Sequence, residues 1–338
     1  MLSKYIAITG KGSACCMQEE IDTADLKPNE AIIEAEATMI SAGTELSRVF
    51  ALKQGFSYPV RPGYSAVGRL LAKGNGLAGI EVGDRVYYSG PHASVCRFSD
   101  GDRTQGPQIY RLPDGIDPKH GTLITLGLVA MNGVNPVDIK LGDTLVVFGL
   151  GTIGILCSLL YQEQGARVIA VDPVGGRCRL AEQMGIKETL DCAPEEQAER
   201  LLKMTGGKGA DIVVDVTGAA PAIMTEASVL ARNSQFVLLG SPRAPYETDV
   251  TPFLNALHMK NVRLTGAFNN LYPLHEVEGS RLSVERNFRV ICERLRDGRI
   301  DAARLISHVI RPEEAEKAYH GLMYDRENYS TVIIDWTL

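Results

Sequence analysis

One glycine-rich segment in the middle of the chain restricts the possible folds more than any other feature. The segment Gly149-Leu150-Gly151-Thr152-Ile153-Gly154 follows the apolar run 145–148 and precedes the apolar stretch 155–161. Such a turn between a strand and a helix lets the backbone approach a pyrophosphate, whose charge then faces the helix N-terminus. The alternative is that the glycines serve only helix–strand packing. We predict a dinucleotide site whose turn consists of Gly149, Gly151, Thr152, Ile153 and Gly154.

An acidic residue follows at the spacing that this kind of site needs. Asp172 ends the next apolar run, 168–171, and lies 18 residues beyond Gly154. At about this distance a carboxylate reaches the ribose hydroxyls of the nucleotide, and it would repel a 2′-phosphate. We therefore expect the cofactor NAD. Arg177 and Arg179 follow closely, and a guanidinium binds phosphate well, so NADP is the less favoured alternative.

From about residue 120 onward, short apolar runs alternate with segments of helical periodicity. Four such runs lie at 145–148, 168–171, 212–216 and 236–239. This alternation predicts an α/β fold, a doubly wound parallel sheet buried on both faces. Thr217, Gly240 and Ser241 follow two of the runs, at carboxyl ends of strands where such sheets bind ligands. We expect them to contact the cofactor, although any sheet of this kind also needs turns there.

The remainder of the chain has a different texture. Short strand patterns at 30–37, 66–72 and 84–88 are broken by Gly, Pro and Asp, which indicates a β-rich domain. After the last strand of the parallel sheet, we expect helices at 283–296 and 312–324 and a strand at 331–335. The 338 residues are about twice a usual domain length, so two domains are expected.

Composition excludes several classes of partner. The net charge of −6 and the lack of a long basic run argue against binding to nucleic acid or to an anionic membrane. The uncharged stretch 144–162 is as long as a membrane span, but its glycines and strand-like start predict a buried strand and helix. Seven cysteines without a secretory start indicate reduced thiols, and hence a cytoplasmic protein that acts on a small molecule.

Several short motifs occur in a characteristic order along the chain. They are Gly83-Asp84-Arg85-Val86, Leu112-Pro113-Asp114-Gly115, Gly142-Asp143-Thr144 and then the glycine-rich turn. This order resembles the medium-chain dehydrogenase/reductase superfamily, of the alcohol and polyol dehydrogenase type. The resemblance implies a GroES-like catalytic domain (1–119), a Rossmann NAD-binding domain (120–268) and a C-terminal segment (269–338) that returns to the catalytic domain. It also implies hydride transfer and a homodimer or homotetramer.

The resemblance includes a departure at the metal positions. Zinc-using members carry a Cys-Gly-Thr/Ser-Asp motif and a Gly-His-Glu-x-x-Gly motif, whereas this chain reads Ala42-Gly43-Thr44-Glu45 and Gly63-Tyr64-Ser65-Ala66-Val67-Gly68. A further family ligand aligns near Thr125. None of these side chains is a normal zinc ligand, so we expect no zinc. The sequences of both motifs resemble those of a zinc-free branch that includes the bacteriochlorophyllide dehydrogenase-like proteins.

Without zinc, another group must exchange a proton with the substrate oxygen. Tyr64 stands at a lost ligand position, where its phenol could donate to a carbonyl oxygen or merely fill the vacated space. Thr44 aligns with the family's hydroxyl relay, and a helix-cap role is its alternative. Glu45 could bond Tyr64 or the substrate, or stabilise a helix start. His92 aligns with a pocket-lining residue and could act as an acid or base, or be structural.

These observations together predict an enzyme. The favoured function is that of a zinc-independent, NAD-dependent oxidoreductase that interconverts a secondary alcohol and a ketone on a polyol, cyclitol or sugar-like molecule. A zinc-free reductase of enones or quinones is the second possibility, although that class more often uses NADPH. An NAD-binding protein without turnover is the third possibility, because the metal ligands are missing.

Overall fold

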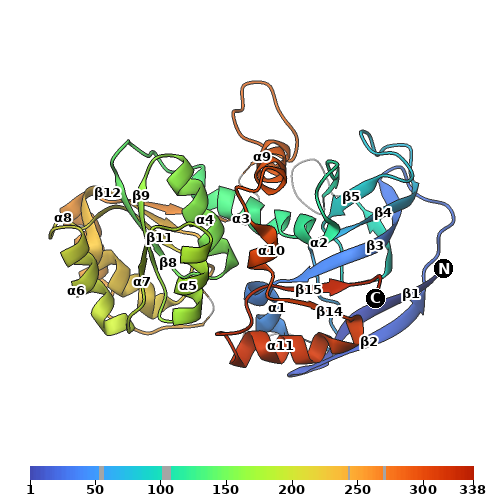
Figure 1. Ribbon diagram of the computed structural model, residues 1–338, viewed down its shortest axis with the longest axis horizontal. Coiled ribbons are helices and arrows are strands. Elements are labelled where there is room, and N and C mark those ends of the chain that lie inside the picture. Colours follow the sequence, from blue (N-terminus) through green and yellow to red (C-terminus); the bar gives the residue numbers. More distant parts are fainter. Residues whose placement is uncertain (53–56, 101–107, 243, 269–271) are drawn as a thin grey trace. The chain divides into compact units, whose positions relative to one another are not determined.

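The computed structural model describes residues 1–338 except 53–56, 101–107, 243 and 269–271. It divides into two compact units, drawn in Figure 1. The first unit combines residues 1–128 with 272–338, and the second comprises residues 129–271. Within the described residues, no helix combines the length and the apolar character that a membrane crossing requires.

The first unit is built on a mostly antiparallel sheet in the order β14-β15-β3-β4-β5-β7, with β6 also paired to β3. The strands of this sheet are β3 (Glu30–Ile40), β4 (Ala66–Lys73), β5 (Arg85–Tyr88), β6 (Val95–Ser99), β7 (Ile109–Arg111), β14 (His308–Ile310) and β15 (Val332–Asp335). A separate hairpin is formed by β1 (Leu2–Gly10) and β2 (Ser13–Glu20). Because β15 pairs with β3, the C-terminal segment completes the sheet that the N-terminal segment begins.

Short helices complete this unit. They are α1 (Ala42–Val49), α2 (Pro118–Gly121), α9 (Val284–Arg296), α10 (Ala302–Leu305), the 3₁₀ turn η2 (Pro312–Glu314) and α11 (Ala315–Tyr324). Helix α3 (Ile124–Val134) contains the limit between the units. Helices α1 and α11 pack in one apolar cluster with Ile40, Val332 and Ile334. The end of β3, which leads into α1, therefore packs against side chains from both the N-terminal and the C-terminal segments of the chain.

The second unit confirms the predicted doubly wound sheet. Six parallel strands lie in the order β10-β9-β8-β11-β12-β13. The strands are β8 (Thr144–Phe148), β9 (Arg167–Val171), β10 (Glu188–Leu190), β11 (Ala210–Asp215), β12 (Leu230–Leu238) and β13 (Arg263–Gly266). The order reverses at β8, so a crevice is expected at the carboxyl ends of β8 and β11.

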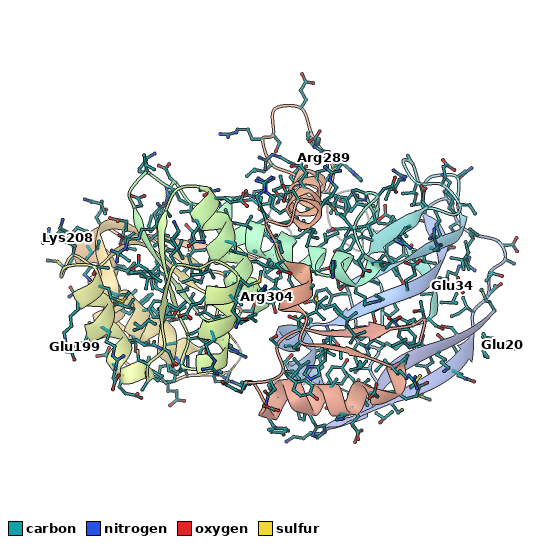
Figure 2. The ribbon with its side chains drawn as sticks, viewed as in Figure 1. Glu20, Glu34, Glu199, Lys208, Arg289 and Arg304 are labelled. Atoms are coloured by element: carbon teal, nitrogen blue, oxygen red, sulfur yellow. The ribbon has the colours of Figure 1, made fainter. Side chains whose placement is uncertain are left out.

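Helices cover both faces of this parallel sheet (Figure 1). They are α4 (Thr152–Glu163), α5 (Gly175–Gln183), α6 (Pro194–Met204), α7 (Ala220–Glu226), the 3₁₀ turn η1 (Ala227–Val229) and α8 (Thr251–Lys260). The uncharged stretch 144–162 forms β8 and most of α4, and its side chains are mostly buried in this unit. Charged side chains point away from the helices, such as Glu199, which pairs with Lys203 (Figure 2).

Candidate functional site

The glycine-rich turn joins β8 to α4 and leaves open space at the helix start. Gly149 has φ +96°, a left-handed conformation that glycine adopts without strain. A Cβ on Gly154 would lie 1.8 Å from the Gly149 carbonyl oxygen, so only glycine fits there. A Cβ on Gly151, the N-cap residue of α4, would meet nothing within 4 Å. A dinucleotide's pyrophosphate would lie here, before the N-terminal N–H groups of α4 at Thr152 and Ile153.

Asp172 follows β9 and is fixed against the same turn. Its Oδ2 atom accepts a hydrogen bond from the Leu150 N–H at 2.8 Å, and its Oδ1 atom accepts one from the Val174 N–H at 2.9 Å. The Arg177 guanidinium donates to Oδ2 at 3.3 Å, and its buried Nε–H has no partner among the described residues. Asp172 therefore holds the glycine-rich turn in place, and Arg177 shares its carboxylate.

The turns after β11 and β12 lie beside the glycine-rich turn. A Cβ on Gly149 would approach Thr217 Cγ2 to 3.1 Å, and one on Gly218 would approach the Ser241 carbonyl oxygen to 2.3 Å. Asp215, at the end of β11, accepts hydrogen bonds from both the N–H and the hydroxyl of Thr217. Thr217, Gly240 and Ser241 therefore belong to the edge that carries Gly149. Asp215 was not singled out from the sequence, because a buried Asp at a strand end has no motif of its own.

In the other unit, Tyr64 lies between two hydroxyl groups. Its phenol oxygen is 2.5 Å from Ser41 Oγ and 3.4 Å from Thr44 Oγ1. Tyr64 is half-buried, Ser41 is buried and Thr44 is exposed. Burial raises the pKa of the Tyr64 phenol above its ordinary value, while the contacts with Ser41 and Thr44 lower this pKa in part. The phenol is therefore a proton donor at neutral pH.

Glu45 and His92 lie deeper and bond each other. Glu45 Oε2 is 3.0 Å from His92 Nε2 and accepts from the Tyr319 hydroxyl at 2.6 Å, while Oε1 accepts from the Ser41 N–H at 2.8 Å. Glu45 is 1% exposed and His92 is fully buried. The Glu45 carboxylate thus accepts hydrogen bonds from three different parts of the chain. One donor is the backbone N–H of Ser41, the residue whose side chain contacts Tyr64.

The tautomer of His92 follows from its neighbours. The Trp336 indole N–H, which can only donate, bonds Thr38 Oγ1 at 3.0 Å. Thr38 Oγ1 lies 2.8 Å from His92 Nδ1. Among the described residues, this nitrogen is the acceptor to which the Thr38 hydroxyl can donate its proton. His92 Nε2 consequently carries the N–H that donates to Glu45. Both ring nitrogens of His92 are used internally, so the structure places His92 with Glu45 and Thr38 and not against Tyr64.

A family model for zinc-binding dehydrogenases matches residues 149–279. Sorbitol dehydrogenase of Halalkalibacterium halodurans is 24% identical over 291 residues, which cover 78% of this chain and 80% of that protein. D-xylulose reductase A of Aspergillus niger is 29% identical over 215 residues, but these cover 62% of this chain and 55% of the reductase.

Solved structures match nearly the whole chain. An oxidoreductase/dehydrogenase of unknown specificity from Escherichia coli has a TM-score of 0.82 at 19% identity, with 99% of both chains covered. Residues 149–279 thus match the zinc-binding dehydrogenase family, and the chain has the fold of the medium-chain dehydrogenases/reductases. Other proteins of similar fold were solved with nucleotides. A protein of Sinorhizobium meliloti 1021 was solved with NADP (TM-score 0.78, 20% identity, 99% of each chain covered). A protein of Escherichia coli CFT073 described as a short chain alcohol dehydrogenase was solved with NADH (TM-score 0.81, 17% identity, 99% of each chain covered).

The side chains at this superfamily's metal positions do not suit zinc. The side chain of Ala42 is only a methyl group, and the phenol oxygen of Tyr64 is hydrogen-bonded to Ser41 Oγ. Thr125 Oγ1 donates to Ser65 Oγ at 2.7 Å, Ser65 Oγ donates to the Thr122 carbonyl at 2.5 Å, and the Tyr87 hydroxyl lies 2.7 Å from Thr125 Oγ1. Within the described ranges, no group of three His, Cys, Asp or Glu side chains could hold a metal ion. Neutral hydroxyls bonded to one another lack the thiolate, imidazole and carboxylate ligands that zinc prefers.

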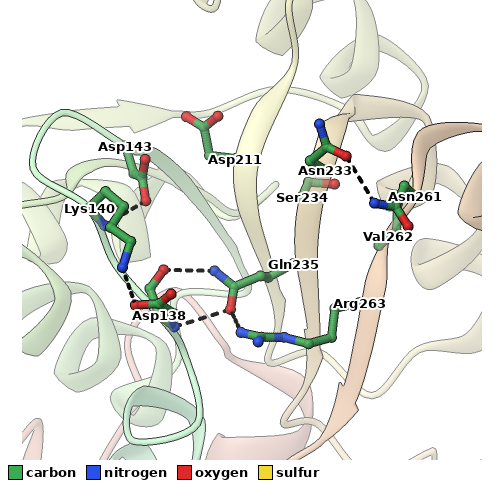
Figure 3. Close-up of a pocket in the computed structure, with 10 residues that line it drawn as sticks. All are labelled: Asp138, Lys140, Asp143, Asp211, Asn233, Ser234, Gln235, Asn261, Val262 and Arg263. Atoms are coloured by element: carbon green, nitrogen blue, oxygen red, sulfur yellow. Dashed lines mark hydrogen bonds and ion pairs between the residues drawn. The ribbon is translucent and has the colours of Figure 1, made fainter.

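A polar pocket of about 420 Å³ lies at the opposite edge of the second unit's parallel sheet, at the amino-terminal ends of the strands (Figure 3). Its lining residues are Asp138, Lys140, Asp143, Asp211, Asn233, Ser234, Gln235, Asn261, Val262 and Arg263. Several of these side chains bond one another, as in the contacts Lys140–Asp138 (2.7 Å) and Asn261–Asn233 (2.9 Å). Because the glycine-rich turn is at the carboxyl ends, we assign neither cofactor nor substrate to this pocket.

Proposed function

We propose that the protein is an NAD-dependent, zinc-independent oxidoreductase that interconverts a secondary alcohol and a ketone on a polyol, cyclitol or sugar-like molecule. The observation that carries this proposal is the half-buried Tyr64 phenol held between Ser41 and Thr44. It offers a proton donor where zinc-using relatives place a metal ligand. All seven cysteines are free, which supports a cytoplasmic location.

Tyr64 would supply the acid and base chemistry. In ketone reduction its O–H donates to the carbonyl oxygen. In alcohol oxidation the phenol first releases its own proton to solvent, and the tyrosinate then takes the proton of the substrate hydroxyl. The raised pKa of the phenol favours the protonated form at neutral pH, so the group is ready for reduction. Thr44 is exposed beside it and can bond the same substrate oxygen or pass the proton to solvent.

The second unit would hold the dinucleotide. Gly149, Gly151 and Gly154 shape the turn, and Asp172 supplies a carboxylate for the ribose hydroxyls. Bound there, NAD provides the hydride acceptor for alcohol oxidation, and NADH provides the donor for the reverse reaction. Asp172 would repel a 2′-phosphate, and it already neutralises the nearby Arg177, which supports NAD over NADP.

We assign Glu45 and His92 to positioning. The three hydrogen bonds to Glu45 fix the start of α1, which carries Thr44, and the preceding residue Ser41. His92 orients the Glu45 carboxylate through its Nε2–H, in a single tautomer. The preference for a polar substrate rests on the sorbitol dehydrogenase and D-xylulose reductase relatives.

A substrate survey tests the proposal. NAD reduction is followed with a panel of polyols, cyclitols and sugars, and NADH or NADPH oxidation is followed with ketoses, enones and quinones. We expect turnover with NAD and a polyol, unaffected by a strong zinc chelator. The Tyr64→Phe variant should retain NAD affinity and lose turnover by about 100-fold or more, the usual contribution of a general acid.

Four outcomes would contradict this assignment. NADPH-dependent reduction of enones or quinones without polyol oxidation would favour the second enzyme class. Tight NAD binding with no turnover in either direction would indicate a binding protein. Loss of activity on chelation, restored by added zinc, would show that a metal takes part. Normal turnover in Tyr64→Phe would remove the role given to this phenol.

A further inference from the structure

Ser41 occupies a helix N-cap position but does not cap the helix. It precedes Ala42, the first residue of α1, with extended backbone angles of φ −87° and ψ 96°. A serine in this position ordinarily accepts a hydrogen bond from a backbone N–H in the first helical turn. The Ser41 side chain makes no such bond and turns toward Tyr64 instead. Its backbone N–H is bound by Glu45, so the helix start is secured by another residue.

The protons of the Ser41 and Tyr64 hydroxyls can be assigned from burial. Ser41 is 4% exposed. Within the described residues, the Ser41 hydroxyl forms its hydrogen bond with the Tyr64 hydroxyl. If Tyr64 donated to Ser41, the serine's own proton would be buried without an acceptor, which is costly. If Ser41 donates, both groups are satisfied, because the half-buried Tyr64 O–H can reach solvent or a ligand.

We propose that Ser41 is a positioning residue that donates its hydrogen bond to the Tyr64 oxygen and so leaves the phenolic proton for the substrate. This inference rests on the proposed function, since it specifies how Tyr64 acts in it. The serine keeps its own proton throughout. When the Tyr64 O–H bond breaks and its proton joins the substrate oxygen, the Ser41 O–H stabilises the tyrosinate that forms. In the oxidative direction, the same contact stabilises the tyrosinate that accepts the proton.

Charged and titratable groups near the Tyr64 phenol also affect its ionisation. Glu45 and Arg48 on α1 act on Tyr64 with opposite signs, and Tyr87 on β5 lies close enough to sense its charge. Glu45 disfavours a tyrosinate and Arg48 favours it. Substituting Ser41 alters none of these charges, so a change in the ionisation of Tyr64 would report the lost hydrogen bond.

Fluorine NMR of protein labelled with 3-fluorotyrosine tests the inference without a substrate. The fluorine lowers phenol pKa values and reports ionisation by chemical shift. Among the 12 tyrosines, the Tyr64 resonance is the one that disappears in Tyr64→Phe. In Ser41→Ala we expect its titration midpoint to rise by about one pH unit, the effect of losing one hydrogen bond to a charged group. Ser41→Thr keeps a hydroxyl and should restore most of the shift.

Ser47→Ala is the matched control, because Ser47 is also buried and lies on the same helix. Its hydroxyl bonds the Thr44 carbonyl and not Tyr64. We expect an unchanged Tyr64 midpoint in this variant. An unchanged midpoint in Ser41→Ala, or an equal shift in Ser47→Ala, would overturn the role of Ser41. The proposed function fails separately, through normal turnover of Tyr64→Phe, and that result would leave the titration outcome intact.

Discussion

At the scale of single residues, two buried carboxyl groups show how differently this molecule treats a polar side chain. Glu45 accepts three hydrogen bonds, whereas neither oxygen of Glu226 has a partner among the described residues. Burial, and next the negative charge of Asp215, raise the pKa of Glu226 well above its ordinary value. Glu226 also ends α7, where the helix dipole disfavours a negative charge. Glu226 is therefore a destabilising group that the fold tolerates.

Replacing Glu226 by methionine should stabilise the second unit. Methionine has a similar length and no unpaired polar atoms, so we expect a gain of about 1 to 3 kcal/mol in the free energy of unfolding. The raised pKa fixes the sign of the pH dependence. The wild-type protein loses stability as the pH rises from the unfolded-state value of ~4.3 through the folded-state pKa of Glu226.

The advantage of Glu226→Met over the wild type should therefore grow with pH above ~4.3. Urea unfolding of both proteins at about pH 5 and about pH 8 measures it. Glu199→Met, on an exposed helix face, serves as the control and should change stability by less than about 0.5 kcal/mol. A pH-independent difference between Glu226→Met and the wild type would show that Glu226 is not held protonated.

His92→Asn should mainly weaken the fold. The substitution breaks the chain from Trp336 through Thr38 to Glu45, and each lost buried hydrogen bond costs about 1 to 3 kcal/mol. We expect a lower melting temperature and a smaller loss of kcat than in Tyr64→Phe, measured on the same substrate. A loss of kcat as large as that of Tyr64→Phe, with an unchanged melting temperature, would make His92 a catalytic residue.

The sequence predicted part of this site and not the rest. Tyr64 and Thr44 could be named together because motif positions place them, and the structure brings their hydroxyls within 3.4 Å. Ser41 could not be recognised, since a serine before a helix looks like an ordinary cap. Burial of His92 depends on partners that lie 54 and 47 residues away in the chain, and no local pattern reports such distances.

At the scale of elements, the strand, glycine-rich turn and helix of the second unit were predictable because the determinants are local. Strand β8 and helix α4 occupy the expected positions, and Ser283 caps α9 as the expected helix at 283–296 requires. The segment predicted as one helix at 312–324 divides into η2 and α11. Pairing of β15 with β3 joins segments about 300 residues apart, which hydrophobic patterning alone cannot specify.

Two glycines of the turn should respond differently to alanine. In Gly154→Ala the new Cβ collides with the Gly149 carbonyl, so we expect a loss of about 1 to 3 kcal/mol in stability and weaker NAD binding. In Gly151→Ala the Cβ enters open space, so stability should be unchanged while NAD binding weakens by about tenfold or more. Thermal unfolding and calorimetric titration with NAD separate the two effects. Unchanged NAD affinity in Gly151→Ala would place the pyrophosphate elsewhere.

At the scale of the whole molecule, the second unit leaves an apolar surface uncovered. Strand β13 ends its sheet and pairs only with β12 within the described residues, so one row of its backbone N–H and C=O groups is free of strand partners. The adjoining helix α8 has no buried residue. Large exposed apolar side chains gather on these elements and beside them, at Val250, Leu254, Met259, Leu264 and Phe268. An exposed edge strand with apolar neighbours is a template for pairing with another chain.

We predict that a second copy of the same chain covers this surface, because a strand edge related by a two-fold axis is complementary to itself. The wild type should sediment as a homodimer, or as a homotetramer that contains this dimer. Leu254→Glu combined with Leu264→Glu places like charges in the interface, and we expect dissociation to monomers at micromolar concentration. Leu141→Lys alters a side chain that is 94% exposed and lies outside these elements, so it should leave the assembly intact. Sedimentation velocity of the three proteins decides the matter. A monomeric wild type, or a double variant that remains dimeric, would show that the surface of α8 and β13 does not mediate self-association.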